Sequence, residues 1–180
     1  MRPRSIIQNR PRRRHRGQAG FTLVELLVTI AIMVIISTWA VPSYQRLAAR
    51  NELAAEVMRI RTALALARNT AITRHMIITL CPSANGTVCD NDDWTAPLLI
   101  IAGRGDGNIK KTDILKVLAR SEAEDVTFSR AGWPIRYKSL GRPTGYNGTF
   151  DICSSGEGGA QVILSNFGRV RTESTRPDSC

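Results

Sequence analysis

One acidic residue interrupts a long apolar stretch near the start of this 180-residue chain. Residues 21–41 are apolar or small apart from a few hydroxyl side chains and a single charge, Glu25. A run of about 20 such residues is long enough to cross a bilayer as a helix. A carboxylate near the end of such a segment costs free energy unless it is paired, so we expect Glu25 to have a cationic partner.

Removal of the segment before the apolar run would create such a cation at the new N-terminus. Residues 1–19 contain seven arginines and no acidic residue, which keeps this arm on the cytoplasmic side of a membrane. A secretory signal has its small-residue cleavage site after its apolar core, but here the small pair Ala19-Gly20 precedes the core. Cleavage between Gly20 and Phe21 would keep the apolar helix on the mature protein. It would also free an ammonium group on Phe21, and in a neighbouring copy that group is the natural counter-ion of Glu25.

At these residues the chain resembles the type IV pilin and pseudopilin family. The match covers a glycine before the cut, an N-methylated phenylalanine after it and a glutamate at the fifth mature position. The matching residues are Gly20, Phe21, Thr22, Leu23 and Glu25. Pro42 falls where the family has a helix-bending proline. The alternative interpretation is a plain single-pass anchor with a basic flank, which would rarely combine this motif with this charge pattern.

The resemblance implies three segments. Residues 1–20 form a basic leader peptide that prepilin peptidase removes, and residues 21–42 form a helix that spans the inner membrane or joins the filament core. Residues 43–180 form a soluble domain on the periplasmic side. The implied partners are prepilin peptidase, other major and minor pilins, and the inner membrane.

The formal net charge of +10 is no nucleic-acid signature by itself. Seven of the 25 basic residues lie in the leader, which leaves 18 against 15 acidic residues in the mature chain. Only a local basic patch can therefore indicate a polyanionic partner.

The four cysteines favour disulfides. All lie beyond the apolar segment, on the side where disulfides persist, and four cysteines allow three connectivities. Cys81 and Cys89 enclose a short turn-forming loop, so we expect a local bridge there, which leaves Cys153 with Cys180. Zinc is the alternative, but the sequence has no C-x-x-C pair and a single histidine after the leader.

The pattern of residues does not favour catalysis. His75 alone would have to serve any nucleophile, and no phosphate-binding glycine loop ends in Lys-Ser or Lys-Thr. We expect no enzyme activity and no cofactor. The acidic residues 90–93 and the stretch 106–113 match a calcium loop only in part, so a solvated acidic loop is favoured. The tripeptide at 104–106 matches a cell-adhesion motif, and such short matches are usually chance.

The expected fold is α+β, in which one long helix packs on a domain of short, mainly antiparallel strands. Residues 43–75 are predicted as a helix, because apolar residues recur at spacings of three and four from Leu53 to Ala71. Pro42 should bend the helix rather than end it. Residues 76–180 are predicted as β-rich. The candidate strands are 76–81, 94–102, 114–118, 126–129, 135–138, 149–153 and 161–165, with a last strand from Val170.

Basic side chains near the end of the chain are candidates for binding an anion. Arg169 and Arg171 flank Val170, so on a strand they point to the same face, and Arg176 follows. Guanidinium groups form paired hydrogen bonds with phosphate, and a cluster of them binds DNA regardless of sequence. Nearby acidic residues and few aromatics favour the alternative, ordinary surface salt bridges. A second basic group that the fold could bring nearby consists of Arg130, Arg136, Lys138 and Arg142.

The rest of the chain is similar to the GspH/FimT group of minor pilins and pseudopilins. The similar segments are 63–74, 78–83, Trp94, 149–153 and Gly168-Arg169-Val170-Arg171. The resemblance implies a minor component of a type IV pilus, at or near the filament tip. It also implies DNA binding for uptake in natural transformation, through Gly168, the two arginines beside it and Arg176. The alternative is a minor pseudopilin of a type II secretion system with a purely structural role.

Overall fold

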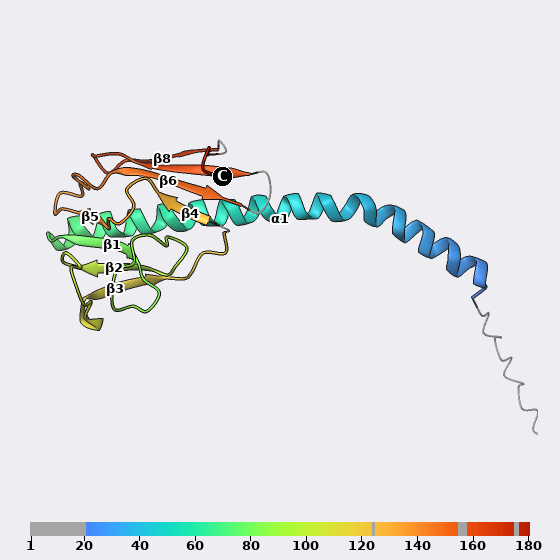
Figure 1. Ribbon diagram of the computed structural model, residues 1–180, viewed down its shortest axis with the longest axis horizontal. Coiled ribbons are helices and arrows are strands. Elements are labelled where there is room, and N and C mark those ends of the chain that lie inside the picture. Colours follow the sequence, from blue (N-terminus) through green and yellow to red (C-terminus); the bar gives the residue numbers. More distant parts are fainter. Residues whose placement is uncertain (1–20, 124, 155–157, 175–176) are drawn as a thin grey trace, which may run out of the picture. The chain divides into compact units, whose positions relative to one another are not determined.

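The structure of this chain, a computed structural model, describes residues 21–123, 125–154, 158–174 and 177–180. The expected leader, with Gly20 at its end, and Arg176 lie outside the described residues. The chain divides into two compact units, Met1–Val41 and Pro42–Cys180. Helix α1 (Leu23–Arg74) contributes to both units and does not end at Pro42 (Figure 1).

Helix α1 begins with a local capping arrangement. The backbone N–H of Glu25 donates to Oγ1 of Thr22 at 3.2 Å. Threonine followed three residues later by glutamate is a sequence signature of a helix start. Glu25 lies in the first turn, where the helix dipole stabilises a negative charge.

The described part of the first unit, residues 21–41, consists almost entirely of an apolar stretch of α1 with its side chains exposed. An 18-residue window has a mean hydropathy of 2.3, so the helix can cross a membrane by length and composition. The hydroxyl groups of Thr29, Ser37 and Thr38 donate to backbone carbonyls three or four residues earlier. These hydroxyls therefore need no water as a partner, as an apolar surrounding requires.

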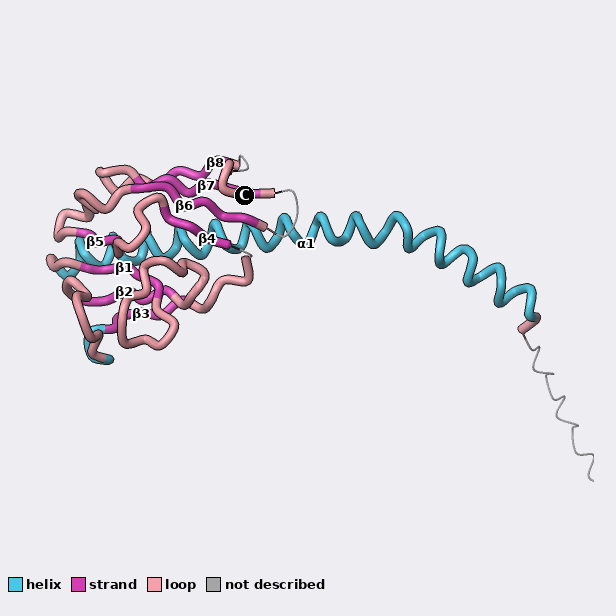
Figure 2. Tube along the Cα trace, in the orientation of Figure 1, coloured by secondary structure: helices cyan, strands magenta, loops and turns pink. Residues whose placement is uncertain are grey.

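Two four-stranded antiparallel sheets form most of the second unit (Figure 1). The first has the order β3-β2-β1-β5, with β1 (Ile78–Pro82), β2 (Leu98–Ala102), β3 (Ile114–Leu118) and β5 (Ile135–Tyr137). The second has the order β4-β6-β7-β8, with β4 (Asp125–Phe128), β6 (Gly148–Cys153), β7 (Gly159–Leu164) and β8 (Val170–Glu173). A short 3-10 helix, η1 (Lys111–Asp113), precedes β3, and long loops join β1 to β2 and β5 to β6 (Figure 2). The predicted α+β class is confirmed.

One hydrophobic core joins the second half of α1 to both sheets. The predicted helix stripe is buried from Val57 to Ala71, and Leu53 packs against it while partly exposed. Trp94 is 1% exposed, and its ring centroid lies 5.4 Å from that of Phe128 and 4.9 Å from that of Phe150. These aromatic rings fill the space between the sheets and the helix, where large buried side chains contribute most of the packing.

A buried carboxylate on α1 links the helix to loops of the first sheet. Glu56 is 3% exposed, and its Oε1 atom accepts from Nη1 of Arg59 at 2.6 Å. Its Oε2 atom accepts from Oγ of Ser121 at 2.7 Å. Arg59 also donates to the backbone oxygens of Ala96 at 2.6 Å and Ala119 at 2.8 Å. Because the charge is paired and hydrogen-bonded, its burial is tolerated.

Two of the predicted strands begin too early, and several other predicted strand ends differ from the structure by one or two residues. The predicted strand 76–81 begins at Ile78 instead, because His75 has a φ of 51° and ends the helix in a tight connection. It also includes Pro82, which was expected in a turn and pairs with Leu98.

The predicted strand 94–102 begins only at Leu98, because local hydrogen bonds hold Trp94 in a turn. The indole N–H of Trp94 donates to the oxygen of Asn91 at 3.0 Å, and the N–H of Thr95 donates to Asp93 at 3.0 Å. The hydroxyl of Thr95 also donates to Asp93, and this bond holds the pKa of the Asp93 carboxyl below its usual value.

The four cysteines form two disulfides. Cys81 pairs with Cys89 and Cys153 pairs with Cys180, which are the pairs that the sequence favours. The second bridge ties the last residue of the sequence to the end of β6.

Candidate nucleic-acid interface

The candidate arginines lie in and beside a tight turn between β7 and β8. The N–H of Ser165 donates to the oxygen of Arg169 at 3.0 Å, and the N–H of Gly168 donates to the oxygen of Ser165 at 2.8 Å. The N–H of Arg169 donates to Oγ of Ser165 at 3.1 Å. These bonds fix the backbone that carries Arg169.

A second glycine turn and the end of α1 support this hairpin turn. Gly168 has a φ of +78°, and a Cβ atom there would lie 2.6 Å from the oxygen of Gly141. Gly141 in turn packs on Ile72, whose Cδ1 atom would lie 2.7 Å from an added Cβ. Nη1 of Arg68 donates to the oxygen of Gly168 at 2.8 Å. Glycine is therefore required at both turns because backbone and helix approach closely.

The two predicted arginines are exposed on this hairpin. Arg171 lies in β8 opposite Ile163, while Arg169 immediately precedes the strand. Neither side chain forms an ion pair with any residue that the structure describes, including Glu173 two positions after Arg171. The salt-bridge alternative thus has no support within the described part of the chain.

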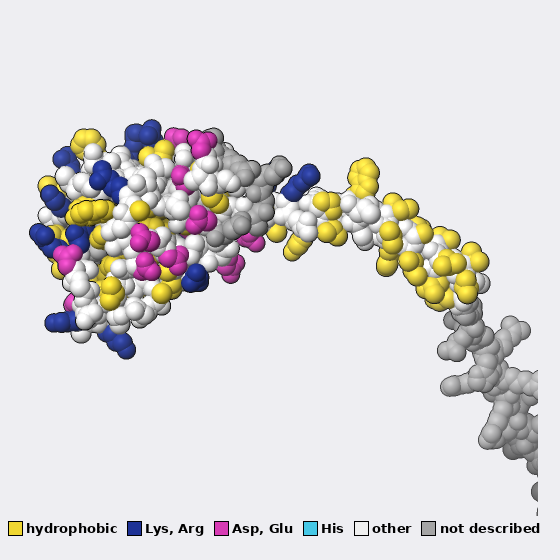
Figure 3. Space-filling view, in the orientation of Figure 1, with side chains coloured by type: hydrophobic (Ala, Val, Ile, Leu, Met, Phe, Trp, Pro, Cys, Tyr) yellow, Lys and Arg dark blue, Asp and Glu magenta, His cyan; other side chains and the backbone are white. Residues whose placement is uncertain are grey.

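A third cation and two exposed hydrophobic residues lie beside the turn. The guanidinium carbon of Arg142 lies 5.1 Å from the ring centroid of Phe167, a cation–π distance. Phe167 is 67% exposed and Leu140 is 79% exposed. The N–H of Lys138, another exposed residue, donates to the oxygen of Arg142 at 3.0 Å. Figure 3 shows lysine and arginine side chains gathered at the left end of this unit, the end at which α1 terminates in Figure 1.

The other candidate cations have different surroundings. Nη2 of Arg136 forms an ion pair with Asp106, and its Nη1 donates to the hydroxyl of Tyr146 at 3.0 Å. Nη1 of Arg130 donates to the oxygen of Gly145 at 3.0 Å. Of the second basic group, the structure therefore brings Arg142, with Lys138, to the hairpin turn.

Sequence reasoning missed Arg68 and the stacking of Arg142 on Phe167. Arg68 lies 100 residues before Gly168, so its hydrogen bond depends on the tertiary fold. Phe167 sits in a turn rather than at a periodic apolar position, and an aromatic residue there was the available signal.

Neither acidic loop forms a metal site within the described residues. In that part of the chain, no three histidine, cysteine, aspartate or glutamate side chains are grouped so that they could hold an ion. The carboxylate of the adhesion-like tripeptide is paired with Arg136, and the Arg104 oxygen accepts from Nε of that same arginine at 2.9 Å. The tripeptide is therefore held against the sheet by its carboxylate and its backbone.

Comparison with known families shows the family to which the chain belongs. The model of the family described as type II transport protein GspH matches residues 56–168, which is more than half of the chain. The chain belongs to the GspH family. A second model, the prokaryotic N-terminal methylation motif, matches residues 15–41.

Relatives of this GspH-family protein are fimbrial proteins and a minor pilin. A fimbrial protein of Pseudomonas aeruginosa is 25% identical over 152 residues, which cover 71% of this chain and 98% of that protein. The type IV major fimbrial protein FimA of Dichelobacter nodosus is 40% identical over 50 residues, 26% of this chain and 32% of its own. A crystal structure of the P. aeruginosa type IV minor pilin FimU is 25% identical with a TM-score of 0.57, and the match covers 72% of this chain and 95% of that one.

These matches confirm the predicted pilin or pseudopilin family. The protein is a minor pilin or pseudopilin of the GspH and FimU kind with an N-terminal methylation motif and an apolar helix near its N-terminus. The motif implies processing by prepilin peptidase and assembly with other pilins.

Proposed function

We propose that this chain is a minor subunit of a type IV pilus and that its β7–β8 turn binds DNA without sequence preference. The observation that supports DNA binding is the pair of exposed guanidinium groups of Arg169 and Arg171, which form no ion pair with a described residue, on a turn held by Arg68. The match to the minor pilin FimU supports a pilus.

The proposed assembly depends on the N-terminal end of the apolar helix. Prepilin peptidase cleaves between Gly20 and Phe21, the new N-terminus is methylated, and Glu25 pairs with the ammonium group of a neighbouring subunit. The arginine-rich leader stays cytoplasmic, so residues 43–180 reach the periplasm, where two disulfides are stable. Pairing lets the carboxylate leave lipid with its charge compensated.

The proposed DNA contacts are made by arginine side chains and one exposed aromatic ring. Arg169 and Arg171 neutralise phosphates, and Arg142 with Phe167 extends the surface by a third cation and an exposed ring. Phosphate contacts fix the position of the duplex but carry no sequence information. The hydrogen-bonded turn holds the arginines in place, so little ordering is needed when DNA binds.

The test is DNA binding by the full chain purified in detergent, measured by fluorescence anisotropy with a labelled duplex across a salt series. We expect affinity to fall as salt rises because bound phosphates release counterions. The double variant Arg169→Ala/Arg171→Ala should bind roughly tenfold more weakly at low salt and should lower the salt slope by about 1 to 2.

The matched control is Lys110→Ala/Lys116→Ala, which removes the same charge from exposed positions outside the turn. It should bind like the unchanged chain. An equal loss of affinity in both double variants would mean that net charge alone drives binding, and no binding at low salt by the folded chain would remove DNA from the proposal.

The alternative function is a minor pseudopilin of a type II secretion system, which the description of the matched family favours. Such a subunit needs Glu25 for assembly in the same way but has no use for the arginine turn. The DNA titration therefore distinguishes a DNA-binding pilin from a purely structural subunit.

A further inference from the structure

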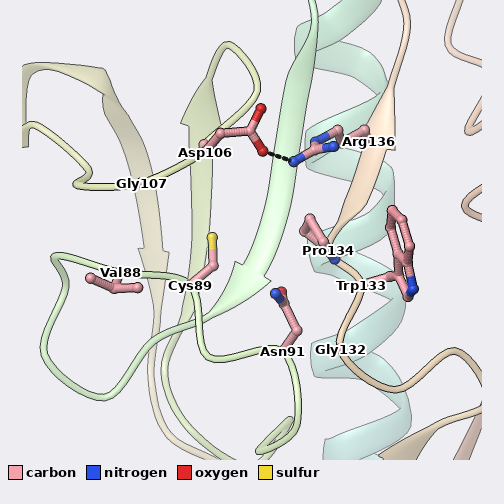
Figure 4. A pocket seen from close by; sticks show the side chains of 10 residues that line it. Val88, Cys89, Asn91, Asp106, Gly107, Gly132, Trp133, Pro134 and Arg136 are labelled. Atoms are coloured by element: carbon pink, nitrogen blue, oxygen red, sulfur yellow. Dashed lines mark hydrogen bonds and ion pairs between the residues drawn. The ribbon is translucent and has the colours of Figure 1, made fainter.

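A pocket of about 340 Å³ lies between three loops, away from the β7–β8 turn. Its lining comes from Val88, Cys89, Asn91, residues 105–107, residues 132–134 and Arg136 (Figure 4). Two of these loops are the acidic loop and the adhesion-like tripeptide, for which the sequence indicated no function. The volume is in the range of pockets that hold small ligands or single side chains.

The walls of this pocket are largely apolar. Val88 is 45% exposed on one loop, and Trp133 is 58% exposed on another. Cys89, in its disulfide, and Pro134 complete the apolar lining. Trp133 is a large aromatic residue that remains exposed in a folded domain, and tryptophan is enriched where proteins bind partners.

The exposed charge of the pocket is a carboxylate. The Asp106 side chain is 63% exposed, whereas the Arg136 side chain that pairs with it is 15% exposed. Arg136 also donates to the oxygen of Arg104 and the hydroxyl of Tyr146, so its N–H groups are engaged on three sides. A ligand in the pocket therefore meets the Asp106 carboxylate rather than the Arg136 guanidinium group.

A second polar side chain, that of Asn91, lines the pocket. Oδ1 of Asn91 is buried, and no residue of the described chain gives it a hydrogen bond. Figure 4 shows Asn91 on the opposite side of the pocket from the Asp106–Arg136 pair. Asp90 and Asp92, which flank Asn91 in the sequence, are exposed. Hydrogen-bond donors that carry positive charge complement such a lining.

We propose that this pocket binds a basic side chain, a lysine or an arginine, of a partner protein. The apolar stem of that side chain lies along the apolar wall that includes Trp133, and its cationic head reaches Asp106. The exposed carboxylate of Asp106 favours this occupant over an anionic one. The site is separate from the DNA-binding turn, so it lets one subunit contact a protein neighbour and DNA at the same time.

The test follows the three indole N–H signals of the full chain in detergent by ¹H–¹⁵N NMR, with Trp133 assigned from Trp133→Phe. The probe is N-acetyl-lysine methylamide, and its uncharged match is N-acetyl-norleucine methylamide. We expect the lysine probe to shift the Trp133 signal with a dissociation constant of roughly 1 to 10 mM, as befits one side chain. The norleucine probe should cause a much smaller shift.

Asp106→Asn should weaken lysine binding at least about fivefold, because the exposed charge is lost. Asp125→Asn, at an exposed aspartate on β4, is the matched control and should bind normally. The Trp94 indole, which is buried and bonded to Asn91, reports whether each variant is folded. Equal shifts with both probes, an unchanged affinity in Asp106→Asn, or no Trp133 shift up to about 50 mM would each overturn the proposal.

Discussion

A buried tyrosine makes the second unit sensitive to alkaline pH. Tyr137 is 0% exposed, and its hydroxyl has no hydrogen-bond partner among the described residues. Burial raises the pKa of Tyr137, and the nearby positive charge of Arg68 opposes this only in part. The folded protein therefore keeps the neutral phenol at a pH where the unfolded chain has lost the proton.

The consequence is a loss of stability above the ordinary tyrosine pKa of about 10. There the unfolded state binds fewer protons than the folded state, so the free energy of unfolding falls by up to about 1.4 kcal/mol per pH unit from this group. We predict that Tyr137→Phe removes this part of the dependence and costs little at neutral pH, because it deletes an unsatisfied hydroxyl.

The measurement is guanidinium unfolding of the chain and of Tyr137→Phe at pH 8 and at about pH 11. Tyr146→Phe is the control, since that ring is only half-buried and its hydroxyl accepts from Arg136. The same fall in stability with pH in Tyr137→Phe as in the unchanged chain would contradict the prediction.

At the scale of elements, the end of α1 orders the hairpin that carries the candidate arginines. Arg68 reaches from the helix to the oxygen of Gly168, and Ile72 packs beneath Gly141, which lies against the same turn. Arg68 is only partly exposed, so its main contribution is to position the turn rather than to contact DNA.

We therefore predict that Arg68→Lys loosens the turn while it keeps the positive charge. DNA affinity should fall about fivefold, the equivalent of roughly 1 kcal/mol for one hydrogen bond, while the salt slope stays nearly unchanged. Amide hydrogen exchange at Gly168 should quicken, with or without DNA.

Arg61→Lys is the control, because Arg61 is an exposed residue of the same helix. A slope that falls by about 1 in Arg68→Lys would instead mean that Arg68 contacts a phosphate directly. Unchanged exchange at Gly168 would mean that the turn does not depend on Arg68.

The elements that periodicity governs are predictable from the sequence, and those that depend on distant contacts are not. The helix stripe from Val57 to Ala71 is visible because a helix repeats every 3.6 residues. The predicted strand 94–102 includes Trp94, but hydrogen bonds from Trp94 to Asn91 and within the loop hold this residue in a turn.

The candidate site shows the same division. Arg169 and Arg171 are two residues apart in the sequence, so their common location could be predicted. Arg142 comes from the loop between β5 and β6, and only the packing of one turn on another brings it to Phe167. The burial of Glu56 was likewise hidden, because its partner Ser121 lies 65 residues away.

At the scale of the whole molecule, two units whose exposed side chains differ in polarity share one helix. Residues 21–41 present mostly apolar side chains, while the unit from Pro42 onward has its own hydrophobic core and both disulfides. Helix α1 joins the two without a break at Pro42. Glu25 is the one charged residue of the stretch 21–41, and we expect the cost of placing it in lipid to be offset when the subunit joins others.

We therefore predict that Glu25→Ala is processed and inserted in the membrane but is at least about tenfold depleted from filaments, because the variant lacks the charge that pairs with a neighbouring ammonium group. The measurement is an immunoblot of sheared filaments, normalised to the membrane fraction. Glu52→Ala, at an exposed glutamate of the same helix in the second unit, is the control and should be incorporated normally. Normal incorporation of Glu25→Ala would mean that apolar packing alone recruits the subunit, in a pilus or a pseudopilus alike. Depletion of both variants would place the defect in the helix rather than in the missing ion pair.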